Sequence, residues 1–313
     1  MPPLPSHCGC ASQGEARACE ARALSSPRPR SRFQALPLFT LFLAAAATLA
    51  WGQDQSSKPR LVPGRDPGGV AVAIVGSGVN YTLPLLASRL ARDGEGDIIG
   101  LDLEDRDNRP FDRSSLSPSG TEIASLIALE APKARLVPVR VGDRDARAIA
   151  GALAFVASGP ARIVILPAWV LSPTMVPELV KAATARRELL LIVAAGDDGA
   201  SLAARADVAR FAALPNVVIV GPVDASGRRL PGSNHGPPVG LAADATRVKV
   251  VTRDGMEREA AGSHIAAARV AALAARLKAP DSRLEGAALR SKLLSFAKDG
   301  VLLAPASIET DGR

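Results

Sequence analysis

The size and composition of the chain are typical of a globular protein with a substantial core. Of its 313 residues, 47% are hydrophobic and 22% are charged, which is ordinary for folded domains. The formal net charge is +7, but the lysines and arginines are scattered and no basic run is interleaved with aromatics. We therefore expect no nucleic-acid partner.

Residues 1–52 are predicted to form a leader with a signal peptide. Three arginines precede an apolar run at residues 33–51, and polar residues follow it, which is the arrangement of a secretory signal. Gln34 and Pro37 interrupt the run, leaving it shorter than the roughly 20 residues that span a bilayer. We expect a periplasmic or secreted protein. The alternative is a membrane protein anchored by residues 33–51, the only way in which we expect contact with a membrane.

All three cysteines, Cys8, Cys10 and Cys19, lie in this leader. The exported form is therefore expected to have no disulfide and no thiolate chemistry. Residues 53–69 are rich in proline and glycine, and this composition predicts a linker.

From residue 70 onward, short apolar runs alternate with helical patterns. We predict strands at residues 70–75, 98–103, 136–141, 163–166, 189–195 and 216–220, and helices at 120–131, 146–158, 175–186, 262–277 and 287–297. This alternation predicts an α/β fold with three layers, a doubly wound and mostly parallel sheet covered by helices on both faces. The crevice of such a sheet lies at the carboxyl ends of its strands. Glycine-rich segments after Val75 and Ala195 should therefore face one crevice.

Six segments, in order, resemble conserved motifs of the subtilisin-like serine proteases (subtilases). They are 71–80 (AVAIVGSGVN), 119–125 (SGTEIAS), 131–141 (APKARLVPVRV), 193–199 (VAAGDDG), 214–227 (LPNVVIVGPVDASG) and 262–273 (GSHIAAARVAAL). The resemblance implies a subtilisin-like domain at residues 70–300, followed by a C-terminal tail at 301–313.

The same resemblance implies that each position of the catalytic machinery is replaced. Gly76 occupies the position of the catalytic Asp and Ser119 that of the catalytic His. Asp197 replaces the Asn that stabilises the oxyanion, and His264 replaces the nucleophilic Ser. Gly76 cannot orient a base and Ser119 cannot act as one at neutral pH. Asp197 offers an acceptor where a donor is required. We therefore expect no catalytic residues.

Two arrangements of the replaced residues remain open. In one, Ser119 or Ser263 is a rearranged nucleophile with His264 as its base and Glu122 as a residue that orients it. The chain would then be a serine-type endopeptidase or hydrolase. In the other, Asp197 and His264 pair and seal an inactive cleft, which would lower the pKa of Asp197.

Ala168 and Trp169 lie where the family has its substrate-binding strand. The resemblance places Trp169 at a small glycine position that borders the specificity pocket. We expect the indole to fill or narrow that pocket.

Three further features have ordinary explanations. His235 is expected in a surface turn, and Gly76-Ser77-Gly78 lacks the third glycine of a dinucleotide fingerprint. An acidic cluster could hold Ca²⁺ but lacks regular ligand spacing, so we predict solvated loop charge. Its members are Asp102, Glu104, Asp105, Asp107 and Asp112.

These observations predict an exported pseudoprotease, a subtilase scaffold that acts in binding or assembly. We expect no cofactor and no metal. The partner is an unknown protein or peptide.

Overall fold

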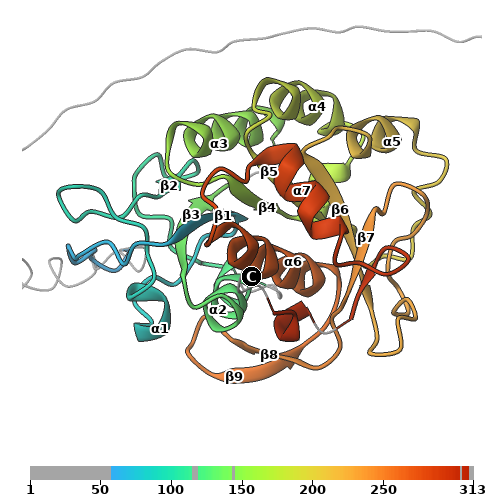
Figure 1. Ribbon diagram of the computed structural model, residues 1–313. Coiled ribbons are helices and arrows are strands. Elements are labelled where there is room, and N and C mark those ends of the chain that lie inside the picture. The colour runs from blue at the N-terminus through green and yellow to red at the C-terminus, as the bar shows by residue number, and fades with distance from the viewer. Residues whose placement is uncertain (1–57, 115–118, 143–144, 304, 310–313) are drawn as a thin grey trace, which may run out of the picture. The chain divides into compact units, whose positions relative to one another are not determined.

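The computed structural model describes residues 58–114, 119–142, 145–303 and 305–309 (Figure 1). The predicted leader, with its signal peptide, its possible anchor at 33–51 and its three cysteines, lies outside the described residues. Within the described residues no helix is both long and apolar enough to cross a membrane.

An eight-stranded parallel sheet forms the centre of the described domain, in the order β10-β7-β6-β5-β4-β1-β3-β2. The strands at the centre of the sheet are buried on both faces, as their unbroken apolar sequences predict. The strands of the whole sheet are β1 (Val70–Gly76), β2 (Leu101–Asp102), β3 (Ala134–Arg140), β4 (Ile163–Leu166), β5 (Leu190–Ala194), β6 (Val217–Val223), β7 (Leu241–Asp244) and β10 (Val301–Leu302). A separate antiparallel hairpin consists of β8 (Val248–Val251) and β9 (Glu257–Ala260).

Helices cover both faces of the sheet, which confirms the predicted three layers (Figure 1). One face carries α2 (Gly120–Glu130), α6 (Ser263–Lys278) and α7 (Gly286–Leu294). The other carries α3 (Ala146–Ser158), α4 (Val176–Ala185) and α5 (Ala206–Ala212). Two short elements pack on the first of these faces: α1 (Pro84–Ala87) contacts α2, and the 3-10 helix η2 (Pro305–Ser307) contacts α6.

Helix α6 is the most deeply buried helix of the described domain. Its sequence, SHIAAARVAALAARLK, is rich in alanine, and nearly every residue is buried. Small side chains let the helix approach the sheet closely. Close packing of this kind fixes the position of the helix start, which presents Ser263 and His264 at the carboxyl edge of the sheet.

The folded domain extends beyond the predicted limits of 70–300 at both ends. The supposed linker packs on the domain. Tyr81 Oη donates a hydrogen bond to the carbonyl of Pro59 (2.9 Å), and Gly64 N donates one to Gly96 O (2.9 Å). In the supposed tail, β10 pairs with β7. These long-range contacts leave no periodic pattern in the sequence, so composition alone does not predict them.

Candidate active-site cleft

The start of α2 places Ser119 at the position of the family's base. Ser119 is the N-cap residue and is buried, with its backbone N–H donating to the Glu122 carboxylate at 2.9 Å. Glu122 also accepts a hydrogen bond from Arg258 Nε on β9 at 2.5 Å. Glu122 therefore caps the helix and pairs with Arg258, and it contacts the backbone of Ser119 rather than orienting an imidazole.

The end of β1 leaves open space where the family's catalytic Asp would lie. A Cβ built on Gly76 would meet no atom within 4 Å. The adjacent Ser77 Oγ accepts a hydrogen bond from Gly120 N at 2.8 Å, which satisfies one donor of the first turn of α2. Position 76 thus lacks a carboxylate although the space for one is present.

Asp197 closes the start of α6. Its carboxylate accepts hydrogen bonds from Ser263 N (2.9 and 3.1 Å) and from Ser263 Oγ (2.7 Å). Ser263 Oγ in turn accepts one from Gly196 N at 3.1 Å, and the serine is fully buried. A carboxylate at a helix N-terminus is stabilised by the unpaired N–H groups and the helix dipole. Both Asp197 and Ser263 are therefore committed to this cap.

His264 lies beside Asp197 at the same helix start. Its Nδ1 is 3.8 Å from Asp197 Oδ2, which is within ion-pair distance but longer than a hydrogen bond. Its Nε2 accepts a hydrogen bond of 3.5 Å from Ala168 N. Burial acts to raise the pKa of Asp197, but His264 and the Ser263 donors outweigh it, so that pKa is lowered. This is the direction predicted for Asp197.

The rearranged pair, with Ser119 or Ser263 as nucleophile and His264 as its base, is not assembled in this structure. Ser119 Oγ and His264 form no hydrogen bond with each other among the described residues. Ser263 lies next to His264 in sequence, but its hydroxyl donates to Asp197. Neither serine therefore has an imidazole positioned to accept its proton.

Trp169 lies in a wall shared by two hollows. After β4 the chain enters a 3-10 helix, η1 (Ala168–Leu171), instead of continuing as a substrate-binding strand. A hollow of about 430 Å³ extends from Trp169 and His264 to Gly76, and a second of about 570 Å³ extends from the same two side chains to Asp197. Trp169 is only partly buried. It therefore divides the cleft without closing it.

The acidic cluster is not solvated loop charge, because Asp102 and Asp112 are fully buried. Lys58 Nζ lies 2.5 Å from Asp102, and 2.8 Å from both Asp105 and Asp107. Arg140 pairs with Asp102 at 3.0 Å and with Glu104 at 2.5 Å. Protein cations therefore pair with every member of the cluster except Asp112, and no group of three His, Cys, Asp or Glu side chains that could hold a metal occurs among the described residues.

His235 lies in a loop paired with Ser201 and is partly buried. It lines neither hollow of the cleft.

Sequence reasoning missed three side chains that shape this region. Lys58 was assigned to a linker, Arg258 was not singled out, and Asp112 was grouped with solvated charges. Asp112 accepts hydrogen bonds from Thr121 N (3.1 Å) and Thr121 Oγ1 (2.5 Å), at the first turn of α2. A carboxylate shortly before a predicted helix start was the available signal for that cap.

The comparisons with known proteins agree with this geometry. A model of the Subtilase family matches residues 68–309, well over half of the chain. A thermophilic serine proteinase of Bacillus sp. (strain AK1) is 28% identical over 224 residues. That match covers 67% of this chain but only 52% of the proteinase, so this chain spans about half the length of that relative.

Solved structures share the fold. A lanthipeptide protease superposes with a TM-score of 0.63 and 20% identity, covering 77% of this chain and 88% of that chain. A cold-adapted subtilisin-like serine proteinase gives a TM-score of 0.61 and 24% identity, covering 79% and 90%. With the family match across the whole described sheet, these findings have one conclusion: the chain belongs to the subtilase family.

Proposed function

We propose that this chain is an exported pseudoprotease, a subtilase domain that does not cleave peptides and acts by binding a protein or peptide partner. The observation that carries the proposal is the Asp197 carboxylate at the oxyanion position, held there by Ser263 N and Oγ at 2.7–3.1 Å.

An acyl transfer needs donors aimed at the oxygen on which negative charge develops. Loss of one such donor costs about 10²–10³ in rate, a magnitude measured in a subtilisin. Here the position carries an acceptor whose pKa is lowered, so it is ionised at neutral pH and repels the intermediate. The N–H of Ser263 at the same place is already bonded to that carboxylate.

The backbone that would bind a substrate also has a different conformation. In η1, Val170 N donates to Pro167 O (3.2 Å) and Ser172 N donates to Trp169 O (3.1 Å). Those groups are no longer free to form a ladder with an extended peptide, the mode in which a strand edge recognises a peptide. The cleft is therefore less able to position a scissile bond, in addition to being unable to stabilise the oxyanion.

The alternative is a serine hydrolase with residual activity. It is favoured by the two open hollows beside His264, which leave room for a substrate. It requires the Ser263 hydroxyl to leave its hydrogen bond with Asp197, or the Ser119 hydroxyl to reach an imidazole. Both serines are buried, at 5% and 0% exposure.

The full chain treated with a fluorophosphonate probe tests the proposal, with an active subtilisin as positive control. We expect no labelling above that of the heat-denatured chain, and mass spectrometry to find no modified serine. Stoichiometric labelling that is lost in Ser119→Ala or Ser263→Ala would refute the proposal and establish the hydrolase.

Export is proposed from the leader sequence alone. Expression of the full chain in a bacterium, followed by fractionation and N-terminal sequencing, is expected to give a processed chain in the periplasm or medium. An unprocessed chain in the membrane fraction would instead assign residues 33–51 as an anchor.

A further inference from the structure

A second concave site lies at the edge of the sheet opposite the cleft. The cleft is at the carboxyl ends of β1, β3 and β4, whereas this hollow of about 570 Å³ is lined by residues at the amino ends of the same strands. We name it the amino-edge pocket. Its charged lining residues are Arg89, Lys133, Arg162, Lys278 and Glu285.

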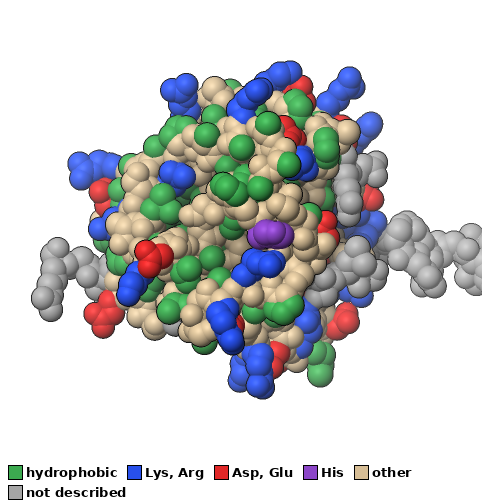
Figure 2. All heavy atoms as spheres, turned by 90° about the vertical axis from the view of Figure 1, so that its right-hand side faces the viewer, with side chains coloured by type: hydrophobic (Ala, Val, Ile, Leu, Met, Phe, Trp, Pro, Cys, Tyr) green, Lys and Arg blue, Asp and Glu red, His purple; other side chains and the backbone are tan. Residues whose placement is uncertain are grey.

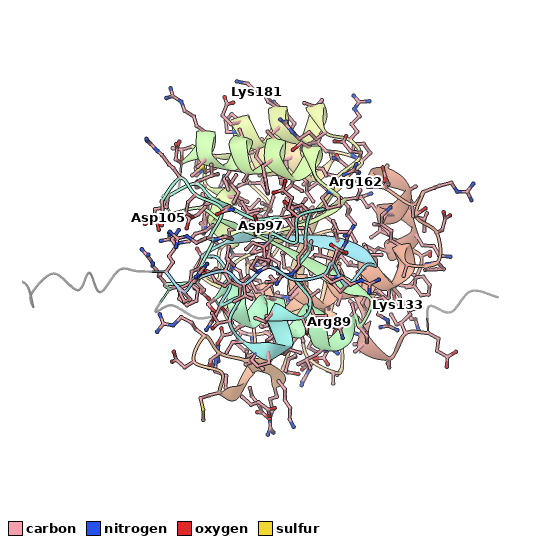
Figure 3. The ribbon with its side chains drawn as sticks, turned by 90° about the vertical axis from the view of Figure 1, so that its left-hand side faces the viewer. Arg89, Asp97, Asp105, Lys133, Arg162 and Lys181 are labelled. Atoms are coloured by element: carbon pink, nitrogen blue, oxygen red, sulfur yellow. The ribbon has the colours of Figure 1, made fainter. Side chains whose placement is uncertain are left out.

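Four cations from four separate segments converge there with a single carboxylate. Figure 3 shows Arg89, Lys133 and Arg162 on one face of the molecule. The lining therefore carries a formal charge of +3, from four positive side chains and one negative one. In contrast, Figure 2 shows another face on which lysines and arginines are spread singly among acidic and hydrophobic side chains.

The cations differ in how they are held. Glu285 lies 3.5 Å from both Arg162 Nε and Lys278 Nζ, so it partly neutralises that pair. Arg89 donates to the carbonyl of Pro132. Among the described residues, neither Arg89 nor Lys133 forms an ion pair with a carboxylate. Two positive charges thus remain without an acidic partner at one side of the pocket.

The rest of the lining is mostly apolar, with Gly68, Gly69 and Ser282 as its other members. Pro67, Pro132, Pro160 and Ala279 contribute walls, and no lining residue is aromatic. A platform for stacking nucleic-acid bases is therefore missing. The volume lies within the range of ligand sites, and the apolar walls suit aliphatic and proline side chains between charged ones.

We propose that the amino-edge pocket binds an acidic peptide segment of a partner protein, with its carboxylates on Arg89 and Lys133 and its apolar side chains against the proline walls. The inference is independent of whether the cleft is inactive, because the two sites share no residue.

Fluorescence anisotropy with the full chain tests this site. The probe is a fluorescein-labelled peptide, Glu-Leu-Glu-Pro-Asp-Leu-Glu-Glu, and its control replaces every Glu and Asp by Gln and Asn. We expect the acidic peptide to bind at least about tenfold more tightly than the amide peptide. The affinity of the acidic peptide should fall as the NaCl concentration is raised, because salt screens exposed charges.

Lys133→Glu is expected to lower the affinity for the acidic peptide about tenfold or more. Lys133 is exposed, so the variant should keep its fold, and circular dichroism checks this. The matched control is Lys181→Glu, the same charge change on α4, whose lysine is also exposed and lies away from the pocket (Figure 3). It should bind like the unmodified chain.

Three outcomes would overturn the assignment. The amide peptide could bind as tightly as the acidic one, or the two Glu variants could lose affinity equally. Displacement of the peptide by inorganic phosphate at equal concentration would assign the pocket to a free oxyanion instead.

Discussion

Helices α2 and α6 begin on the two sides of the cleft, and both begin on carboxylates. At α2, Asp112 accepts from Thr121 N and Oγ1 while Glu122 accepts from Ser119 N. At α6, Asp197 accepts from Ser263 N and Oγ. In the family these helix starts present the base and the nucleophile, whereas here the carboxylates of Glu122 and Asp197 and the hydroxyl of Ser263 are committed to capping.

The two caps differ in burial. The side chain of Asp112 is fully buried, whereas that of Asp197 is 41% exposed. Breaking a hydrogen bond between a carboxylate and its donors costs more free energy of folding when the groups are buried than when they are exposed. Water cannot reach the buried groups to replace the missing partner. The α2 cap should therefore stabilise the fold, while the α6 cap mainly sets the charge of the cleft.

The largest effect on stability is expected for Asp112→Ala. It leaves Thr121 N–H and hydroxyl without their buried acceptor, and we expect a loss of about 2–3 kcal/mol in the free energy of unfolding. Urea denaturation of the full chain measures it, with Asp112→Asn as the control that keeps an acceptor. A loss below about 0.5 kcal/mol would remove the distinction between the two caps.

A smaller effect is expected for Asp197→Ala. Loss of a partly exposed helix cap costs about 1 kcal/mol, and the same urea measurement applies. The comparison fails if Asp197→Ala destabilises the chain as much as Asp112→Ala does.

The smallest effect is a pH dependence. The pKa of Asp197 is lowered from 3.8 in the folded chain, so its ionised form contributes stability above that value. The contribution is lost as pH falls through the lower folded pKa. The stability difference between the unmodified chain and Asp197→Asn should be constant well above pH 3.8 and should shift toward the Asn variant as pH falls below 3.8 through the lowered folded pKa. A difference that does not change with pH would contradict the lowered pKa.

The sequence was sufficient to predict six strands of the sheet, but not β7 or β10, and it predicted positions facing the cleft. Strands β1 and β5 were predicted from unbroken apolar runs, and the glycines that follow them mark where the chain leaves the sheet. Because parallel strands end at one edge, Gly76 and Asp197 were expected at one crevice. His264 was placed there by the resemblance of residues 262–273 to the subtilase motif that carries the nucleophile. The structure brings all three to the cleft.

Contacts between distant segments were not predictable. Lys58 meets Asp102 across 44 residues, and Arg258 meets Glu122 across 136. Neither leaves a periodic pattern. The 3-10 turn at Trp169 was also missed, since a short apolar segment after a strand is equally compatible with a longer strand. The cations of the amino-edge pocket come from four segments that are far apart in the sequence. The positive charge that gathers in the folded pocket was therefore not visible in the sequence.

Hydrolysis of a fluorogenic peptide substrate by the full chain tests the central claim most directly. The comparison variant restores the family's residues with Gly76→Asp, Ser119→His, Asp197→Asn and His264→Ser, and the space beside Gly76 admits the first of these. We predict hydrolysis by the unmodified chain no faster than in buffer, and a measurable rate for the restored variant. Turnover by the unmodified chain that disappears in Ser119→Ala or Ser263→Ala would contradict the account.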